Sequence, residues 1–305
     1  MKKKWLMTGG AIGISGVVML TTGFTALAST SGYDAYKSAL KTTKALKSVT
    51  VQVSGSLMDN GTILEQGQGT LKANMQNEAK SGNFQISGKS GNESLQLFAQ
   101  NNGEVWKTSN NNTYYLKQDK ADQEEGNHQE GKSAWMDQQA ETVVDALVGN
   151  LKNYVQSTTQ SDGSKQISVQ LSQTQIPAVV QALAPLALHR FGNENGDSNE
   201  HKDQQDPERA FGETLLLNQV LPITQDIQIQ SFRLDATINA SNQIESQQAS
   251  ITFTGKDTNG NAHTVSFDFD AKLTGFDQTV PDTIDLTGKT VKTVQDRHEG
   301  HNHED

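Results

Sequence analysis

Polar and apolar residues alternate between Ser48 and Lys117, and short turn-forming clusters interrupt the alternation. Val49, Val51 and Val53, for example, are separated by single polar residues. A period of two places successive side chains on opposite faces of a strand. We therefore predict an antiparallel sheet with one polar and one apolar face. The remaining predicted strands of this part cover 63–75, 84–86, 95–99, 105–108 and 114–117.

Gly67 and Gly69 interrupt the second of these strands. Glycine inside a strand marks a bulge or strong curvature, and we expect one of these there. Alternation returns at 167–171 and again at 227–238, 251–253 and 265–273. The last three strands predict a second meander, so that the first meander is one half of a larger curved sheet.

Helical spacing of apolar residues appears in four segments, at 33–47, 135–155, 177–188 and 211–221. In the first, Tyr36, Ala39 and Leu40 fall on one stripe with lysines opposite, which predicts an amphipathic helix. The predicted fold class is α+β: a strongly curved antiparallel sheet, an unclosed half-barrel, covered on its concave side by helices at 34–47, 135–155 and 177–188.

The predicted domain covers 33–290 and contains two acidic insertions, at 118–132 and 192–208, which have few large apolar residues. Segments of this composition do not bury enough apolar surface to offset the entropy of ordering, so we expect both to be flexible. The histidine-rich and acidic segment 291–305 is predicted to be a disordered tail.

The first 28 residues have the pattern of a secretory signal peptide. Lysines at 2–4 precede a mostly apolar stretch, 5–24, and an A-x-A sequence ends at Ala28. We predict cleavage after Ala28 and a location that is secreted or on the extracytoplasmic face of the membrane. The alternative is an uncleaved anchor, because about twenty apolar residues can span a bilayer. Membrane contact is expected only through this segment.

Composition excludes several classes of function. The net charge is -10, which disfavours nucleic acid as a partner because phosphates require a basic patch. Cysteine is absent, which excludes disulfides, thiolate metal sites and a thiol nucleophile. A hydrophobic share of 33% and a mean hydropathy of -0.62 indicate an economical core.

No catalytic motif is present: there is no nucleophile elbow, phosphate-binding glycine loop or helical histidine pair. We therefore predict no enzymatic activity and no cofactor, with an orphan hydrolase as a remaining alternative. Asp268 and Asp270 share a strand face and are interpreted as an ordinary solvent-facing row. The tail histidines His298, His301 and His303 could chelate a metal weakly, and we interpret them as part of a solvated tail.

Apolar residues that strands and helices would bring together are the candidates for a ligand cavity between the sheet and its helices. These are Trp106, Tyr114, Val180, Leu183, Leu186, Phe267 and Phe269.

The order of these predicted elements, with the closing segment 276–284 (FDQTVPDTI), resembles the LolA/LppX/LprG-like superfamily of extracytoplasmic lipoprotein and lipid carriers. The resemblance implies an unclosed barrel with helices at its mouth and acyl chains bound inside. The chain departs from the lipidated members because it lacks the lipobox cysteine, and it carries two acidic insertions. Its lysine-rich start and glycine-rich signal also resemble those of secreted proteins of Gram-positive bacteria.

The resulting hypothesis is an exported, non-enzymatic protein that binds an apolar ligand, a lipid or a lipidated partner, in the cavity of a curved sheet. The alternative is an envelope interaction or structural protein whose core is filled by its own side chains.

Overall fold

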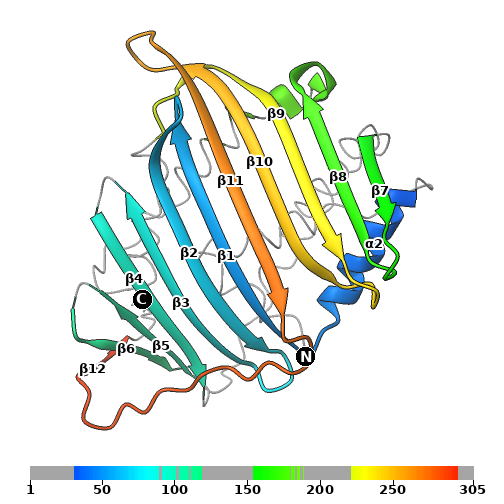
Figure 1. Cartoon of the computed structure of the whole chain (residues 1–305). Coiled ribbons are helices and arrows are strands. Elements are labelled where there is room, and N and C mark those ends of the chain that lie inside the picture. Colours follow the sequence, from blue (N-terminus) through cyan, green and yellow to red (C-terminus); the bar gives the residue numbers. More distant parts are fainter. Residues whose placement is uncertain are drawn as a thin grey trace, which may run out of the picture.

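The computed structural model describes residues 31–88, 91–100, 103–109, 111–118, 154–178, 180–182, 184–185, 188 and 221–294. Its main feature is one open sheet of twelve strands in the order β12-β6-β5-β4-β3-β2-β1-β11-β10-β9-β8-β7 (Figure 1). The predicted large curved sheet is thus confirmed, and it incorporates both predicted meanders.

The first half of the sheet consists of β1 (Ser48–Asp59), β2 (Thr62–Asn74), β3 (Ala79–Gly88), β4 (Gly91–Gln100), β5 (Gly103–Thr108) and β6 (Tyr114–Gln118). The second half consists of β7 (Val155–Thr159), β8 (Lys165–Ser172), β9 (Gln225–Ile238), β10 (Ile244–Lys256) and β11 (Ala262–Thr274). The short strand β12 (Val291–Val294) completes the order, and the helical elements whose bounds are fully described are α2 (Ser31–Lys44) and the 3-10 turn η2 (Gln173–Gln175).

Pairing between β1 and β11 joins the two halves into one sheet. These antiparallel strands are in register from Thr50 opposite Thr274 to Asp59 opposite Val265. Strand β12 pairs with β6 in parallel, so the sheet is mixed and not wholly antiparallel. Residues 291–294, which were assigned to the tail, therefore form an edge strand.

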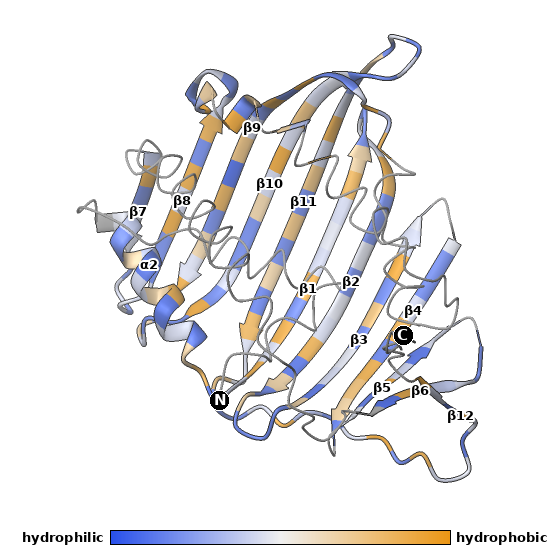
Figure 2. Ribbon diagram, turned by 180° about the vertical axis from the view of Figure 1, so that it is seen from behind, coloured by the Kyte–Doolittle hydropathy of each residue, from blue (hydrophilic) through white to orange (hydrophobic). Residues whose placement is uncertain are grey.

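The two faces of the sheet differ as the alternation predicts. Val51 lies opposite Leu273, and one residue further along each strand Gln52 lies opposite Lys272. Rows of this kind continue across neighbouring strands, and bands of opposite hydropathy follow one another along β8 to β11 (Figure 2). We call the face that carries Val51 and Leu273 the apolar face, and the opposite one the polar face.

The prediction that helices cover the concave side of the sheet is wrong. Helix α2 lies at one end of the sheet beside β7 (Figure 1), where Gly32 comes so close that a Cβ would lie 3.0 Å from the Val155 carbonyl oxygen. The Thr43 hydroxyl accepts a hydrogen bond of 2.9 Å from the Ile244 amide, which fixes the other end of the helix to β10. Helical periodicity identified α2, but these specific contacts determine where it docks.

The other predicted helices are described only in part. The segment 135–155 lies outside the described residues apart from its last two, and Val155 begins β7. Described residues between Ala178 and Leu188 are helical, and the side chain of Gln181 exchanges hydrogen bonds of 2.7 and 2.8 Å with the backbone of Ile229 on β9. Residues 1–30, 119–153 and 191–220 are outside the described part, so the signal, both insertions and the helix at 211–221 remain predictions.

A strap formed by residues 275–290 runs from β11 to β12 past the ends of β1 to β6 (Figure 1). The Thr279 amide donates to the Ser48 hydroxyl at 2.9 Å, and the Asp282 amide donates to the Ser81 hydroxyl at 2.8 Å. The Gln100 side chain exchanges two hydrogen bonds, of 2.7 and 2.8 Å, with the backbone of Ile284. The strap is therefore fixed to three strands by polar contacts. Among the described residues, no helix is long and apolar enough to cross a membrane.

Candidate functional site

Buried apolar clusters surround the middle of the apolar face. The largest joins α2 to β8 and β9 and reaches Leu57, Phe253 and Val265 near one end of the central strands. A second, around Leu95 and Trp106, covers β3 to β5, and a third, with Ala271 and Leu273, lies at the other end of β11. The edges of this face are therefore packed as an ordinary protein core.

The residues between these clusters are less buried. We call them the apolar centre, which consists of Val53, Ala249, Ile251, Phe267 and Phe269; all five lie on the apolar face and all are half-buried. The middle of a large sheet is normally its most buried region, because side chains from all sides cover it. The side chains of the apolar centre are therefore covered less completely than the clusters around them, although Ala249, Ile251 and Phe267 pack against the largest cluster.

Two glycines deepen the apolar centre. Gly55 on β1 lies directly opposite Gly67 on β2, with Phe269 on one side of the pair and Ile86 on the other. Between Phe269 and Ile86, therefore, no side chain rises from the sheet across two strands, a width of roughly 10 Å at the usual strand spacing. The strand was predicted to bulge or curve at Gly67 and Gly69, but its bulge lies at neither glycine.

The bulge of β2 occurs opposite Leu57 and Met58, where Leu57 pairs with Glu65 but Met58 pairs with Ile63. The extra residue is Leu64. Leu64 and Glu65 are both buried, with 5% and 6% of their surface exposed, and Glu65 shares a row with Leu57 and Phe267 on the apolar face. A bulge re-aims the side chain that follows it, and here it brings a carboxyl group onto an apolar surface.

Burial removes water from around the Glu65 carboxyl group, and this desolvation raises its pKa above the usual value. The stem of the side chain lies on Gly88 of β3, where an added Cβ would come within 2.6 Å of the Glu65 Cγ. No described residue forms a hydrogen bond or ion pair with this carboxyl group. An ionisable group with this environment is a candidate functional residue.

The acidity of Glu65 predicts a pH dependence of stability. Its pKa in the folded state lies above the unfolded value of 4.5, so the charged form destabilises the fold at neutral pH and the penalty disappears as the pH falls toward 4.5. Glu65→Gln should therefore be more stable than the wild type at pH 7.5, and the difference should shrink at pH 4.5. Urea denaturation of both proteins at the two pH values measures this; a difference that is equal at both would contradict it.

The polar face contains a hollow of about 1020 Å³ over the middle strands. Hydroxyl and carboxamide groups such as Ser54, Ser56, Gln68 and Gln85 line it, together with Asp268 and Asp270, and Gly55, Gly67, Ile86, Ala249 and Phe269 also contribute to its lining. These groups partly bond to one another, because Gln68 donates to Gln85 at 3.2 Å and Gln248 donates to Asp270 at 2.7 Å. Such a surface is well hydrated, whereas small-molecule sites are mostly apolar with few polar groups. Asp268 and Asp270 belong to a solvent-facing row, as predicted.

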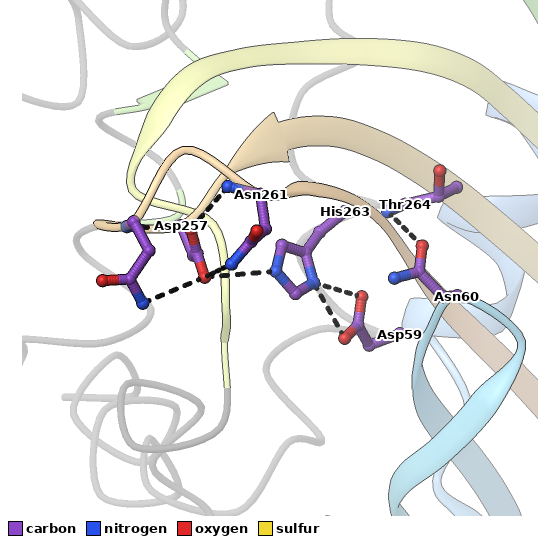
Figure 3. Close-up of polar contacts among 7 residues, drawn as sticks. Asp59, Asn60, Asp257, Asn261, His263 and Thr264 are labelled. Atoms are coloured by element: carbon purple, nitrogen blue, oxygen red, sulfur yellow. Dashed lines mark hydrogen bonds and ion pairs between the residues drawn. The ribbon is translucent and has the colours of Figure 1, made fainter.

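A polar cluster joins two hairpins near the ends of β1 and β11 (Figure 3). The His263 ring lies between two carboxylates, with Nδ1 at 2.9 Å from Asp59 Oδ2 and Nε2 at 3.8 Å from Asp257 Oδ2. The described residues include no group of three or more side chains suited to a metal. The contacts of the ring connect the hairpin that follows β1 with the hairpin that precedes β11.

The structure places the predicted cavity residues in different environments. Phe267 and Phe269 belong to the apolar centre, and Phe267 packs edge-on against Phe253 with ring centroids 6.0 Å apart. Trp106 is buried on the apolar face, where its cross-strand partner is Tyr115. Tyr114 points to the polar face, with the Lys107 and Lys289 ammonium groups 5.8 and 5.4 Å from its ring centroid.

Val180 is half-buried against the largest cluster. Leu183, Leu186 and the tail histidines His298, His301 and His303 lie outside the described residues. Glu65 was missed by sequence reasoning. Its signal was the pair Ile63 and Leu64, two adjacent apolar residues that break the alternation just before a glutamate.

Comparisons with known proteins give only a distant structural resemblance. No family model and no curated protein matches the chain. A DUF1329 family protein from Desulfovibrio piger is similar over 79% of this chain and 92% of its own, with 5% identity and a TM-score of 0.20. A LolA superfamily protein from Nitrosomonas europaea is similar over 80% of this chain and 94% of its own, with 8% identity and a TM-score of 0.21. Likenesses of this size carry no argument, so function must be argued from the residues.

Proposed function

We propose that the protein is a non-enzymatic binding protein that holds an apolar ligand, the acyl chain of a lipid or of a lipidated partner, on the apolar centre of its sheet. The observation that carries this proposal is that the middle of the apolar face is less buried than the residues around it. Leu57, Val265 and Ala271 around the centre are at most 3% exposed, whereas Phe267 and Phe269 between them are half-buried. An acyl chain lying over the glycine pair would cover the exposed parts of Phe267 and Phe269.

The alternative is a core filled entirely by the protein's own side chains, as in a structural or interaction protein. The buried clusters at the edges are filled in this way, and the two ideas differ only at the apolar centre. Native mass spectrometry of the full chain purified from its host should detect a bound acyl ligand. Ligand-free protein that also fails to bind the apolar dye N-phenyl-1-naphthylamine would favour the self-filled core.

The location of the protein belongs to the same proposal. A carrier of this kind works outside the cytoplasm, which fits the predicted signal segment at 1–28. Mass analysis of the mature protein should give an N-terminus at Ser29. A chain that begins at Met1 and stays in the membrane fraction would instead support the anchored alternative.

A pair of variants on one strand tests which face binds the ligand. Ile251 belongs to the apolar centre, and the next residue on β10, Thr252, faces the other way. Ile251→Gln should weaken binding of N-phenyl-1-naphthylamine by about tenfold, because it removes apolar contact area worth roughly 1–2 kcal/mol. Thr252→Gln adds the same side chain to the polar face and should leave binding unchanged. Equal loss of binding in both variants would place the dye elsewhere or indicate damage to the fold, which circular dichroism detects.

A further inference from the structure

We infer that Glu65 binds the polar end of the ligand, and that the site therefore selects amphiphiles whose head group donates hydrogen bonds, an ammonium or a hydroxyl group. This inference rests on the proposed function and adds to it the chemistry of the ligand's head.

The first support is the position of Glu65 relative to the apolar centre. Ile251 pairs with Phe267, Phe267 with Leu57, and Leu57 with Glu65, so all four lie in one row across the sheet. At the usual strand spacing the Glu65 backbone lies about 10 Å from that of Phe267. The glycine pair begins two residues further along β2, at Gly67. The carboxyl group thus borders the apolar centre, where the head of a chain lying on the glycine floor would end.

The second support is the way in which Glu65 reaches this face. Continued alternation after Leu64 would put the side chain of residue 65 on the polar face and that of Gln66 on the apolar face. The bulge at Leu64 puts it on the apolar face, and Gly88 on β3 leaves room for its stem because any side chain there would collide with it. Two local features of the chain, the extra residue and the glycine, act together to place one carboxyl group.

The third support is the cost of leaving the group there alone. Glu65 is 6% exposed and none of the described residues donates to it. Desolvation disfavours the charged form of this carboxyl group, and its oxygen atoms are not among the fully enclosed side-chain atoms, so a head group can reach them. A ligand head group that donates to the carboxylate would satisfy it. An ammonium group would also neutralise its charge.

The same chemistry disfavours other head groups. A fatty acid carries a carboxylate at neutral pH, which would face Glu65 as a like charge in a region of low dielectric constant. We therefore expect amine, alcohol and acid of equal chain length to bind in that order.

The test uses the full chain and displacement of N-phenyl-1-naphthylamine at pH 7.5 by dodecylamine, dodecanol and laurate. Wild-type protein should bind dodecylamine about tenfold to a hundredfold more tightly than laurate, the range expected for a hydrogen bond to a charged group. Glu65→Gln should reduce the affinity for dodecylamine by about tenfold and leave dodecanol nearly unchanged. Glu65→Leu should lower the affinity for both.

Glu245→Gln is the matched control, because Glu245 is an exposed glutamate on β10. This variant makes the same chemical change away from the apolar centre and should bind all three amphiphiles like the wild type. Unfolding by urea should show that Glu65→Gln and Glu65→Leu are folded and at least as stable as the wild type, since each removes a buried charge.

The outcomes separate this inference from the proposed function. If neither the dye nor any amphiphile binds, the proposed function fails. If all three amphiphiles bind equally and the Glu65 variants retain that behaviour, the apolar site stands and the role of Glu65 is wrong. An equal loss of dodecylamine binding in Glu245→Gln would indicate non-specific attraction of a cation to an acidic protein, which also overturns the role of Glu65.

Discussion

Replacement of Gly69 by alanine is expected to destabilise the protein by about 2–3 kcal/mol, within the range for overpacking a filled site. Gly69 on β2 lies directly opposite Phe84 on β3. The Phe84 ring lies across the sheet, so that a Cβ at Gly69 would come within 2.2 Å of its Cδ1. On the same strand as the phenylalanine, a Cβ at Gly82 would come within 2.6 Å of Cε2. The ring thus lies over two glycines, and a side chain at Gly69 would have to displace it.

Gly67, two residues before Gly69, provides the control. A Cβ at Gly67 would meet the Gln85 carbonyl oxygen at 3.4 Å and the Ile86 side chain at 3.6 Å, which are ordinary contacts. Gly67→Ala should therefore be nearly neutral or slightly stabilising, because glycine loses the most backbone entropy on folding.

Urea denaturation of the two single variants measures the difference, and Phe84→Leu completes a double-mutant cycle with Gly69→Ala. The cycle should show that alanine at 69 costs much less when the ring is gone. Equal destabilisation by Gly69→Ala with phenylalanine or leucine at 84 would mean that the glycine is required for a reason other than the ring.

Local pattern was sufficient to predict most of the strands. The alternating valines of β1 and the Asp59-Asn60-Gly61 turn defined the first hairpin, and the structure gives Asn60 and Gly61 positive φ angles of 49° and 79°. The junction between β1 and β11 could only be expected in general terms. Its register depends on contacts between residues more than 200 positions apart, such as Thr50 with Thr274, which no local period encodes.

The position of the helices could not be predicted for the same reason. Periodicity shows that α2 has an apolar stripe, but its place at the β7 end is set by tertiary contacts, among them the close approach of Gly32 and the hydrogen bond to the Thr43 hydroxyl. Helices commonly pack over one face of a sheet, and the prediction assigned this common arrangement to α2. The place where a helix packs depends on tertiary contacts, and the local sequence indicates it only through small residues that allow a close approach.

The candidate site was predicted in part. Phe267 and Phe269 follow from alternation alone, since both lie on the apolar side of β11. Tyr114 and Tyr115 are adjacent aromatic residues, so alternation cannot decide which of them shares a face with Trp106; pairing across β5 and β6 selects Tyr115. Glu65 was hidden because a single inserted residue reverses the face of everything that follows it.

Replacement of His263 by leucine is expected to destabilise the protein by about 1–2 kcal/mol at neutral pH, because it leaves the Asp59 carboxyl group without its hydrogen-bond partner in a partly buried site. The side chains of His263, Asp59 and Asp257 are only 17–20% exposed. Hydrogen bonds, first from the Asn261 side chain, lower the pKa of Asp257 to about 2. This carboxylate is therefore charged at neutral pH. The imidazole separates it from Asp59.

The ring also joins two turns. Asp59 ends β1, and Asp257 opens the turn before β11, where it accepts from the Asn259 and Asn261 amides at 2.9 and 2.8 Å (Figure 3). Next to the ring, Asn60 and Thr264 exchange hydrogen bonds of 2.8 and 3.0 Å between the same two strands. Loss of the ring should thus loosen the β1–β11 junction that unites the two halves of the sheet.

Addition of Asp59→Asn to the His263→Leu protein should recover a large part of the lost stability, since the amide removes one of the two facing charges. His263→Asn, which keeps a polar side chain, should cost less than leucine. Thermal unfolding of the three variants together with hydrogen exchange of the β1 and β11 amides measures these effects. Exchange that quickens only in the 257–261 turn would show that the histidine stabilises its own hairpin and does not hold the halves together.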